Sequence, residues 1–209
     1  MRDRIIGELG DLAHRRFLVY LMGPYRAFDV AHVLDGIEPD AIPESVDLDG
    51  LVDSKAGGPS GRRDTLDLLL ELRDALRTGP GVNAFLAIDV SLDELDAASL
   101  SIAFARASNA VVYVVPAVGD NLGVGIEVGA VLEALFGIER SVDGGDHHRE
   151  RVLFVHESAV TSAMIAAVRD RWEARVYSYD DRVDLDRQVR LFARDLMRKE
   201  RLGALPRLD

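Results

Sequence analysis

The sequence predicts a doubly wound α/β fold, in which a five-stranded parallel sheet of the flavodoxin or Rossmann type carries helices on both faces. Two observations lead to this prediction. Five short apolar segments recur along the chain, and amphipathic segments of helical length separate most of them. Strands that alternate with helices build a parallel sheet, and right-handed crossovers place the helices over both of its faces.

The first part of the chain combines two ordinary elements with one long irregular segment. Residues 4–14 carry four aliphatic side chains at helical spacing, which predicts a short amphipathic helix. Residues 17–22 form a continuous apolar run that stops at Gly23-Pro24, which is typical of a buried strand followed by a sharp loop. Residues 27–63 contain three prolines and many aspartates, so we expect an irregular insertion within a single domain that spans 1–209.

The rest of the chain alternates regularly between apolar runs and amphipathic segments. Asp89 falls at the end of the second predicted strand, and residues 141–150 predict a polar loop. The later predicted strands are 84–90, 110–115, 151–155 and 175–179, and the predicted helices are 64–78, 95–107, 124–136, 161–172 and 184–201.

The composition excludes several classes of protein. The chain has no cysteine, so it holds no disulfide, no thiolate metal site and no cysteine nucleophile. Its formal net charge of −11 argues against a nucleic-acid partner, because nucleic-acid affinity depends largely on cations that neutralise phosphates. Its apolar runs are too short to span a membrane, and its first residues lack the apolar core of a signal peptide. We therefore expect a cytoplasmic protein with no membrane partner.

The charged residues have an unusual distribution. Lys55 and Lys199 are the only lysines, so almost all cations are arginine, and aspartate outnumbers glutamate. Such a composition is typical of a cytosolic protein from a salt-accumulating halophile. The acidity then indicates the habitat rather than a cationic partner, since net charge bears on solubility more than on fold.

The predicted fold indicates where a ligand would bind, because doubly wound sheets hold ligands beyond the carboxyl ends of their strands. Three segments qualify: residues 23–26, Asp89, and residues 116–127. In the third segment, glycines allow close approach of a ligand to the backbone, and a helix is predicted to start beside Glu127. The simpler interpretation is that Glu127 only complements the dipole of the first helical turn.

Two familiar nucleotide-binding motifs do not occur in the chain. The glycines of residues 123–129 have the spacing G-x-G-x-x-x-G and follow the third predicted strand, so they fail the dinucleotide fingerprint in both pattern and place. No segment has the pattern of a phosphate-binding P-loop. The adjacent His147 and His148 lie in a glycine-containing loop without the spacing of a metal site, so we expect no metal and no cofactor.

Two segments together carry a family resemblance. Tyr-Leu-Met-Gly-Pro-Tyr at 20–25 and Asn-Leu-Gly-Val-Gly-Ile-Glu-Val-Gly at 121–129 resemble motifs of the nucleoside 2-deoxyribosyltransferase superfamily, which includes 2′-deoxynucleoside 5′-monophosphate N-glycosidases. The resemblance implies that Glu127 is the nucleophile and that Tyr20 orients it, although a core tyrosine on a buried strand is an equally good interpretation of Tyr20. It also implies that the loop after the first strand shapes the sugar or phosphate pocket. The substrate-binding residues implied or inferred are Gly23, Pro24, Tyr25, Arg26, Asp120, Asn121, Gly123 and Gly125.

The chain departs from the family pattern at two places. The family has an aspartate on the helix before the third strand that helps to protonate the leaving base, but residues 99–103 here are Ser-Leu-Ser-Ile-Ala. Asp89 and Asp96 are the candidates for that second acid. Where transferases have an acid six residues before the nucleophile, this chain has Asn121, with Asp120 beside it.

The chemistry requires both carboxyl groups. Cleavage of an N-glycosidic bond passes through an oxocarbenium-like state, which a carboxylate such as Glu127 can stabilise and trap covalently. A second acid must protonate the departing base. Arg26 suits a phosphate as an anchor, although a surface arginine is the simpler interpretation.

Two functional hypotheses follow. In the first, the protein cleaves or transfers the N-glycosidic bond of a nucleoside or nucleotide through Glu127. In the second, the same cleft binds a nucleotide without turnover, as a regulatory module. The resemblance also implies a homodimer, for which helices 4–14 and 184–201 offer apolar stripes.

Overall fold

The computed structural model describes most of the predicted helices and strands. The described residues are 1–10, 17–24, 59–79, 81–90, 97–117, 129, 131–136, 147–160, 165, 168–170 and 174–208. Most of the predicted insertion, the segment 91–96 and the segment 118–128 lie outside these residues. Within the described ranges, no helix combines the length and the apolar content that a bilayer-spanning segment needs.

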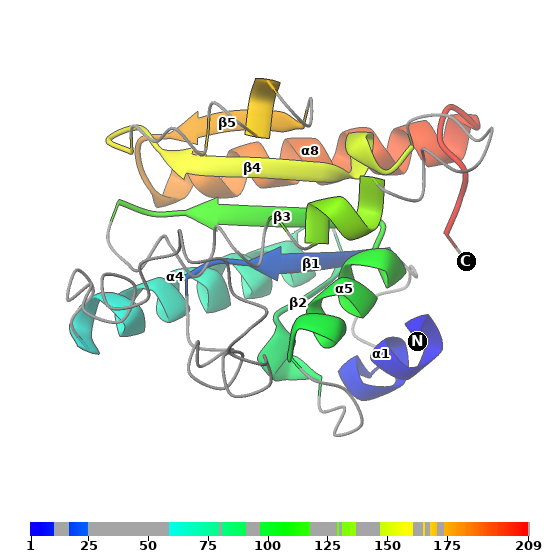
Figure 1. Ribbon diagram of the computed structural model, residues 1–209, viewed down its shortest axis with the longest axis horizontal. Helices are drawn as coiled ribbons and strands as arrows, with labels where there is room; N and C mark the ends of the chain where they lie inside the picture. Colours follow the sequence, from blue (N-terminus) through cyan, green and yellow to red (C-terminus); the bar gives the residue numbers. More distant parts are fainter. Residues whose placement is uncertain are drawn as a thin grey trace, which may run out of the picture.

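The centre of the structure is one parallel sheet of five strands, as the sequence predicts. Its order is β2-β1-β3-β4-β5, and every neighbouring pair is parallel. Figure 1 shows the strands running in one direction across the molecule. The strands are β1 (Leu18–Met22), β2 (Asn83–Phe85), β3 (Ala110–Val115), β4 (Val152–Glu157) and β5 (Arg175–Tyr179).

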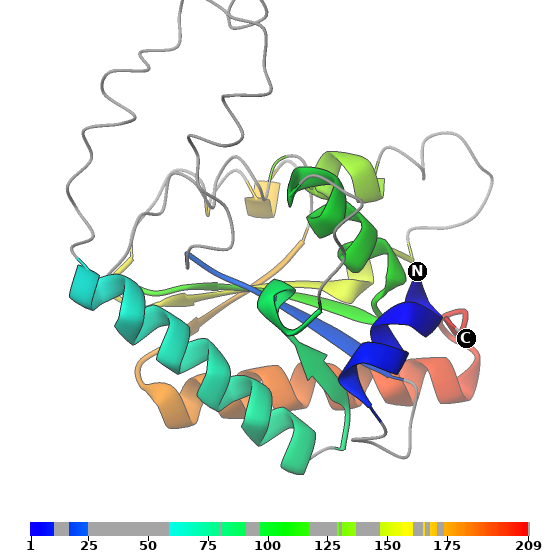
Figure 2. The same cartoon turned by 90° about the horizontal axis from the view of Figure 1, so that it is seen from below.

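Helices cover both faces of this sheet, and the alternation along β1 shows how. Leu18, Tyr20 and Met22 pack into one core cluster with α1 (Arg2–Leu9), α5 (Ala97–Ala107) and helical residues 131–136. Val19 and Leu21 pack into the other, with α4 (Pro59–Thr78) and α8 (Arg182–Leu202). Figure 2 shows α4 and α8 together beneath the sheet. Because β1 is buried on both faces, its sequence is a continuous apolar run.

Three predicted boundaries were wrong by more than two residues. The helix predicted over 4–14 is α1, which ends at Leu9 with Gly10 as its C-cap at φ 69°. The predicted strand 84–90 is short, because Asp89 accepts a hydrogen bond from the Leu86 amide at 2.9 Å and turns residues Ala87–Asp89 into a 3₁₀ helix. The helix predicted from residue 64 begins at Pro59, inside the predicted insertion. Proline suits the first position of a helix, since an amide hydrogen there has no intrahelical acceptor.

The last helix has the capping chemistry that its flanking residues favour. The Asp181 side chain accepts a hydrogen bond from the Asp184 amide at 2.8 Å, so part of the aspartate cluster before this helix caps it. Gly203 ends the helix at φ 75°, a left-handed conformation that glycine adopts without strain.

A buried network of hydrogen bonds lies at the amino edge of the sheet, where the strands begin. Arg151, at the start of β4, is 3% exposed and donates to Glu200 Oε1 at 2.6 Å and to the Asn109 carbonyl at 3.0 Å. Asn109 Nδ2 donates to the same Glu200 oxygen at 2.9 Å, and Asn109 Oδ1 accepts from the Leu18 amide at 2.9 Å. A second Arg151 nitrogen donates to the Pro206 carbonyl at 2.5 Å. The network therefore joins β1, β3, β4, α8 and the chain after α8.

Removal of the acid from this network should destabilise the fold strongly. We expect Glu200→Ala to lower the free energy of unfolding by about 3–5 kcal/mol, because it leaves the Arg151 guanidinium buried without its counter-ion. Glu71→Ala is the matched control, since Glu71 also pairs with an arginine, Arg182, but on the surface. That pair should be worth about 0–1 kcal/mol. Denaturant unfolding of both variants measures the difference, and equal losses would contradict a central role for the network.

His148, beside the same edge, should make stability depend on pH. Burial first, and then nearby positive charges led by Arg151, lower the pKa of His148 below its ordinary value of 6.5. The folded state therefore holds His148 neutral where the unfolded chain protonates it, and this contribution is lost as the pH falls below about 6.5. We expect His148→Gln to remove that part of the acid destabilisation in unfolding measured from pH 7 downward. An unchanged pH profile would contradict the prediction.

Candidate functional site

The strand order identifies the candidate site. The connection from β1 leads to β2 on one side of β1, while β3 lies on its other side, so the strand order reverses between β1 and β3. Met22 of β1 is in register with Tyr113 of β3, which brings the carboxyl ends of the two strands together. Ligands of doubly wound folds bind at such a point, beyond the carboxyl ends of the strands.

Gly23 allows the end of β1 to pack closely against its neighbours. A Cβ atom at this position would lie 2.9 Å from Leu69 Cδ1 of α4 and 3.1 Å from the Val114 carbonyl oxygen of β3. These distances are too short for most side chains. Glycine at 23 thus serves the junction between β1, β3 and α4, and it sets where the chain leaves the sheet at Pro24.

Tyr20 lies in the middle of β1 and is 1% exposed. Its hydroxyl shares a hydrogen bond of 3.0 Å with Ser101 Oγ of α5. Its ring stacks on Phe85 at 5.1 Å between centroids and meets Phe104 edge to face at 5.6 Å. The tyrosine is therefore a core residue whose polar tip is held in place, and its side chain points to the face of the sheet that α5 covers.

Sequence reasoning missed Ser101 as a site residue. It belongs to the stretch 99–103, where the family resemblance implies an aspartate, and it is fully buried. A serine can accept and donate hydrogen bonds, but it cannot supply a proton as a carboxylic acid does. Its partner could be found only from the structure, because Tyr20 and Ser101 are far apart in the sequence.

Asp89 is engaged in contacts within the fold. Arg73 donates to its Oδ1 at 2.5 Å, Arg77 approaches Oδ2 at 3.5 Å, and the Leu86 amide also donates to Oδ2. Arg77 binds the Ala84 carbonyl of β2 as well, at 2.7 Å. Both oxygens of Asp89 thus hold α4 against the outermost strand, whereas a general acid must present a protonated oxygen to the leaving group.

A second contact at the carboxyl edge was not expected from the sequence. Glu157, the last residue of β4, accepts a hydrogen bond from the Ala117 amide at 2.7 Å. Ala117 follows Pro116, which has no amide hydrogen, and it is the last described residue before segment 118–128. Glu157 therefore fixes the point at which the chain leaves β3 toward Glu127. His156, its neighbour, hydrogen-bonds the Glu157 carbonyl at 2.9 Å.

Most of the predicted site residues lie outside the described part of the chain: Tyr25, Arg26, Asp96, Asp120, Asn121, Gly123, Gly125 and Glu127. Their roles stay predictions. The structure does describe the helix that follows Glu127. Its residues 131–136 pack in the same core cluster as Tyr20, so this helix and the tyrosine share one face of the sheet.

Two other places in the described structure lie apart from the candidate site. Among the described residues, no group of histidine, aspartate and glutamate side chains is arranged to hold a metal ion, and His147 and His148 belong to none. A hollow of about 540 Å³ lies near the amino edge and is lined by Met1, Arg2, Ala103, Arg106, Ala107, Arg207 and Leu208. It is remote from the strand-order reversal and from the candidate site.

Comparison with known proteins gives a family for almost the whole chain. Residues 2–209 match a family model described as Domain of unknown function (DUF7509). A search of curated proteins finds no significant match.

The contacts of Asp89 lead to a test that separates its two interpretations. We expect Asp89→Asn to lower the free energy of unfolding by about 1–3 kcal/mol, because two partly buried arginines lose a charged acceptor. Asp74→Asn is the matched control: Asp74 also pairs with Arg73, at 2.8 Å, but its side chain is 62% exposed. Its loss should stay within about 0.5 kcal/mol. Unchanged stability of Asp89→Asn would return Asp89 to consideration as the general acid.

Proposed function

The chain belongs to the DUF7509 family, and we propose that it cleaves or transfers the N-glycosidic bond of a nucleoside or nucleotide, with Glu127 as the nucleophile. The observation that carries this proposal is the strand order β2-β1-β3-β4-β5. It brings the ends of β1 and β3 together, so the two segments that resemble deoxyribosyltransferase motifs, 20–25 and 121–129, follow adjacent strands at the ligand-binding edge of the fold.

The packing of the following helix supports a place for Glu127 near Tyr20. Glu127 stands two positions before Gly129, and the described residues 129 and 131–136 are helical. This helix and Tyr20 lie on one face of the sheet. The start of the helix would direct its positive dipole end to the same space, which favours a carboxylate and an anionic ligand there.

The proposed reaction assigns a role to each group. The Glu127 carboxylate attacks the anomeric carbon from the face opposite the base, and the bond to the base breaks as the glycosyl ester forms. Water or a second base then releases the sugar. Because Asp89 is held by two arginines, Asp96, which directly precedes α5, becomes the first candidate for the acid that protonates the base.

The remaining predicted residues would bind the substrate. Tyr25 and Arg26 follow the end of β1, and a guanidinium at 26 matches a 5′-phosphate. Asp120 and Asn121 can hydrogen-bond sugar hydroxyls or phosphate, and Gly123 and Gly125 allow the ligand to approach the backbone. None of these roles requires a metal or an organic cofactor.

One observation favours a second candidate function, a nucleotide-binding module without turnover. In the stretch where the resemblance implies an acid on α5, the buried side chain that faces Tyr20 is Ser101. A site without that acid could bind the nucleoside and still fail to protonate the leaving base.

Substitution of the nucleophile separates the two functions. We expect wild-type protein to release free base from a deoxynucleoside or deoxynucleotide, and Glu127→Ala to reduce that release to background, because the covalent intermediate cannot form. Glu133→Ala, an exposed glutamate on the same helix, should retain wild-type activity. Chromatography of released base after incubation in concentrated KCl measures both, since a chain this acidic is at risk of self-repulsion in dilute buffer.

Mass spectrometry of the quenched protein gives an independent check of the same reaction, because a 2′-deoxysugar should be found on Glu127. Nucleotide binding that persists in Glu127→Gln, without base release from wild type over long incubation, would contradict catalysis and support the binding module.

A further inference from the structure

The hollow of about 540 Å³ at the amino edge is lined by positive charge. Among the described residues that line it, the charged ones are Arg2, Arg106 and Arg207, and the other four are apolar. The chain as a whole has 36 acidic residues against 25 lysines and arginines. A hollow whose described charges are all cations therefore differs from the rest of this chain, and its field would attract an anion.

The three arginines come from distant parts of the chain. Arg2 belongs to α1, Arg106 to the last turn of α5, and Arg207 to the segment that follows α8. Figures 1 and 2 show the start of α1 and the segment after α8 on the same side of the molecule. That last segment is fixed to the fold, because Arg151 donates a hydrogen bond to the Pro206 carbonyl. The tertiary structure therefore builds the hollow.

Two neutral acceptors hold the guanidinium group of Arg2. Its Nη1 atom donates to the Ala107 carbonyl at 2.6 Å, and its Nη2 atom donates to Asn109 Oδ1 at 2.8 Å. Asn109 belongs to the buried network of hydrogen bonds, since its Oδ1 atom also accepts from the Leu18 amide. A guanidinium that is already fixed before a ligand binds loses little conformational entropy on binding, which favours affinity.

Arg106 and Arg207 are exposed, and they contact carbonyl groups. Arg106 donates to the Ala134 carbonyl at 3.0 Å, and Arg207 Nε donates to the Glu200 carbonyl at 3.5 Å. Neither arginine forms an ion pair with another residue in the described ranges. The Glu200 carboxylate itself pairs with Arg151 in the buried network. The positive charges of Arg106 and Arg207 can therefore pair with a ligand without breaking an ion pair among these residues.

The positive charge of this edge also acts on a neighbouring histidine. Burial first, and then the charges of Arg151, His147 and Arg106, lower the pKa of His148. His148 directly precedes the short 3₁₀ helix before β4, so Arg106 acts on an element other than its own. This effect supports, independently of the hollow's lining, a concentration of positive charge at the amino edge.

We propose that the hollow is a binding site for a small molecule that carries a diphosphate group. Guanidinium groups bind phosphate oxygens through pairs of parallel hydrogen bonds, and three of them match the several negative charges of a diphosphate. The volume of about 540 Å³ lies within the range of small-molecule sites, which is about 300–1,000 Å³. Ala103, Ala107 and Leu208 form an apolar wall for the rest of such a molecule.

A small anion fits this edge better than an extended polyanion does. Exposed Asp3 and Glu8 lie on α1, the helix that carries Arg2. They would repel a nucleic-acid strand that crossed the hollow, whose binding depends on many cations along its length. A small ligand contacts only the lining residues. The hollow is remote from the candidate site, so the proposal does not depend on the chemistry at Glu127.

Binding can be tested on the full-length chain with inorganic pyrophosphate as the probe. Isothermal titration calorimetry is carried out at the lowest KCl concentration at which circular dichroism shows the folded chain. We expect wild-type protein to bind pyrophosphate and to unfold at a higher temperature in its presence. The double variant Arg106→Gln/Arg207→Gln should raise the dissociation constant at least about tenfold, because two charged hydrogen-bond donors are lost.

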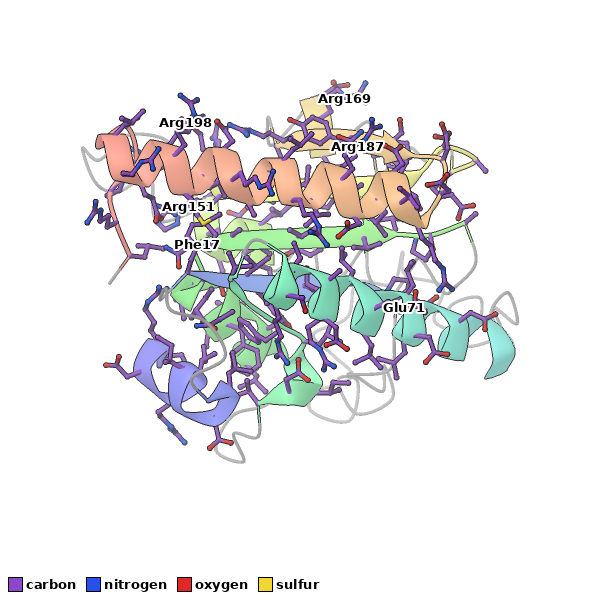
Figure 3. The ribbon with its side chains drawn as sticks, turned by 180° about the vertical axis from the view of Figure 1, so that it is seen from behind. Phe17, Glu71, Arg151, Arg169, Arg187 and Arg198 are labelled. Atoms are coloured by element: carbon purple, nitrogen blue, oxygen red, sulfur yellow. The ribbon has the colours of Figure 1, made fainter. Side chains whose placement is uncertain are left out.

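Two single variants are the matched controls, and both should bind pyrophosphate as wild type does. Arg187→Gln removes an exposed arginine of α8, and Figure 3 shows Arg187 far along this helix from Arg151 at the amino edge. Arg26→Gln removes the arginine that is proposed to bind phosphate beside Glu127. Binding that is lost in Arg26→Gln and kept in the double variant would assign the anion to the candidate site and overturn the proposal.

Ala103→Leu tests the hollow itself, because it fills space at a half-buried position and leaves all three arginines in place. We expect it to raise the dissociation constant by at least about tenfold as well, while circular dichroism shows that the variant is folded. The proposal would be overturned by a folded wild-type chain that does not bind pyrophosphate, or by unchanged binding in either Ala103→Leu or the double variant. An equal loss in Arg187→Gln would also overturn it, since the attraction would then be diffuse.

Discussion

The buried ion pair between Arg151 and Glu200 is the constraint on which the rest of the structure depends. A guanidinium that is 3% exposed loses most of its hydration, so its position is stable only where acceptors surround it. Those acceptors come from Glu200 of α8, the Asn109 carbonyl and the Pro206 carbonyl. The Asn109 side chain also accepts a hydrogen bond from the Leu18 amide of β1. The Arg151 guanidinium therefore sets the relative positions of three strands and the last helix.

The network divides the molecule into two functional ends. At the amino edge, polar atoms from several elements are used in mutual hydrogen bonds, and this edge maintains the fold. At the carboxyl edge, the chain leaves β1 at Gly23-Pro24 and leaves β3 at Ala117, which Glu157 holds by its amide. Because the amino edge maintains the fold, the loops at the carboxyl edge can carry binding and catalytic residues, as is common in doubly wound folds.

The fold could be predicted from the sequence to a large extent, and the site much less. All five strands were located, because a parallel strand buried on both faces must be a continuous apolar run. The error at the second strand occurs where side-chain contacts, which apolar periodicity does not record, set the course of the backbone. The second strand is short because Asp89 turns back to the Leu86 amide and binds arginines of α4. The pairing of Tyr20 with Ser101 has no sequence signal, since a serine on an apolar helix face has no preferred partner until the helix packs.

The spacing of apolar residues determined which segments are strands and which are helices. A helix that buries one stripe has apolar residues every three or four positions, and a strand buried on both faces is a continuous apolar run. Only the tertiary structure decided that Asp89 supports the outer strand β2 and that Glu157 binds the Ala117 amide where the chain leaves β3. These facts depend on contacts between residues far apart in the chain, and such contacts form only when the strands have assembled in their final order.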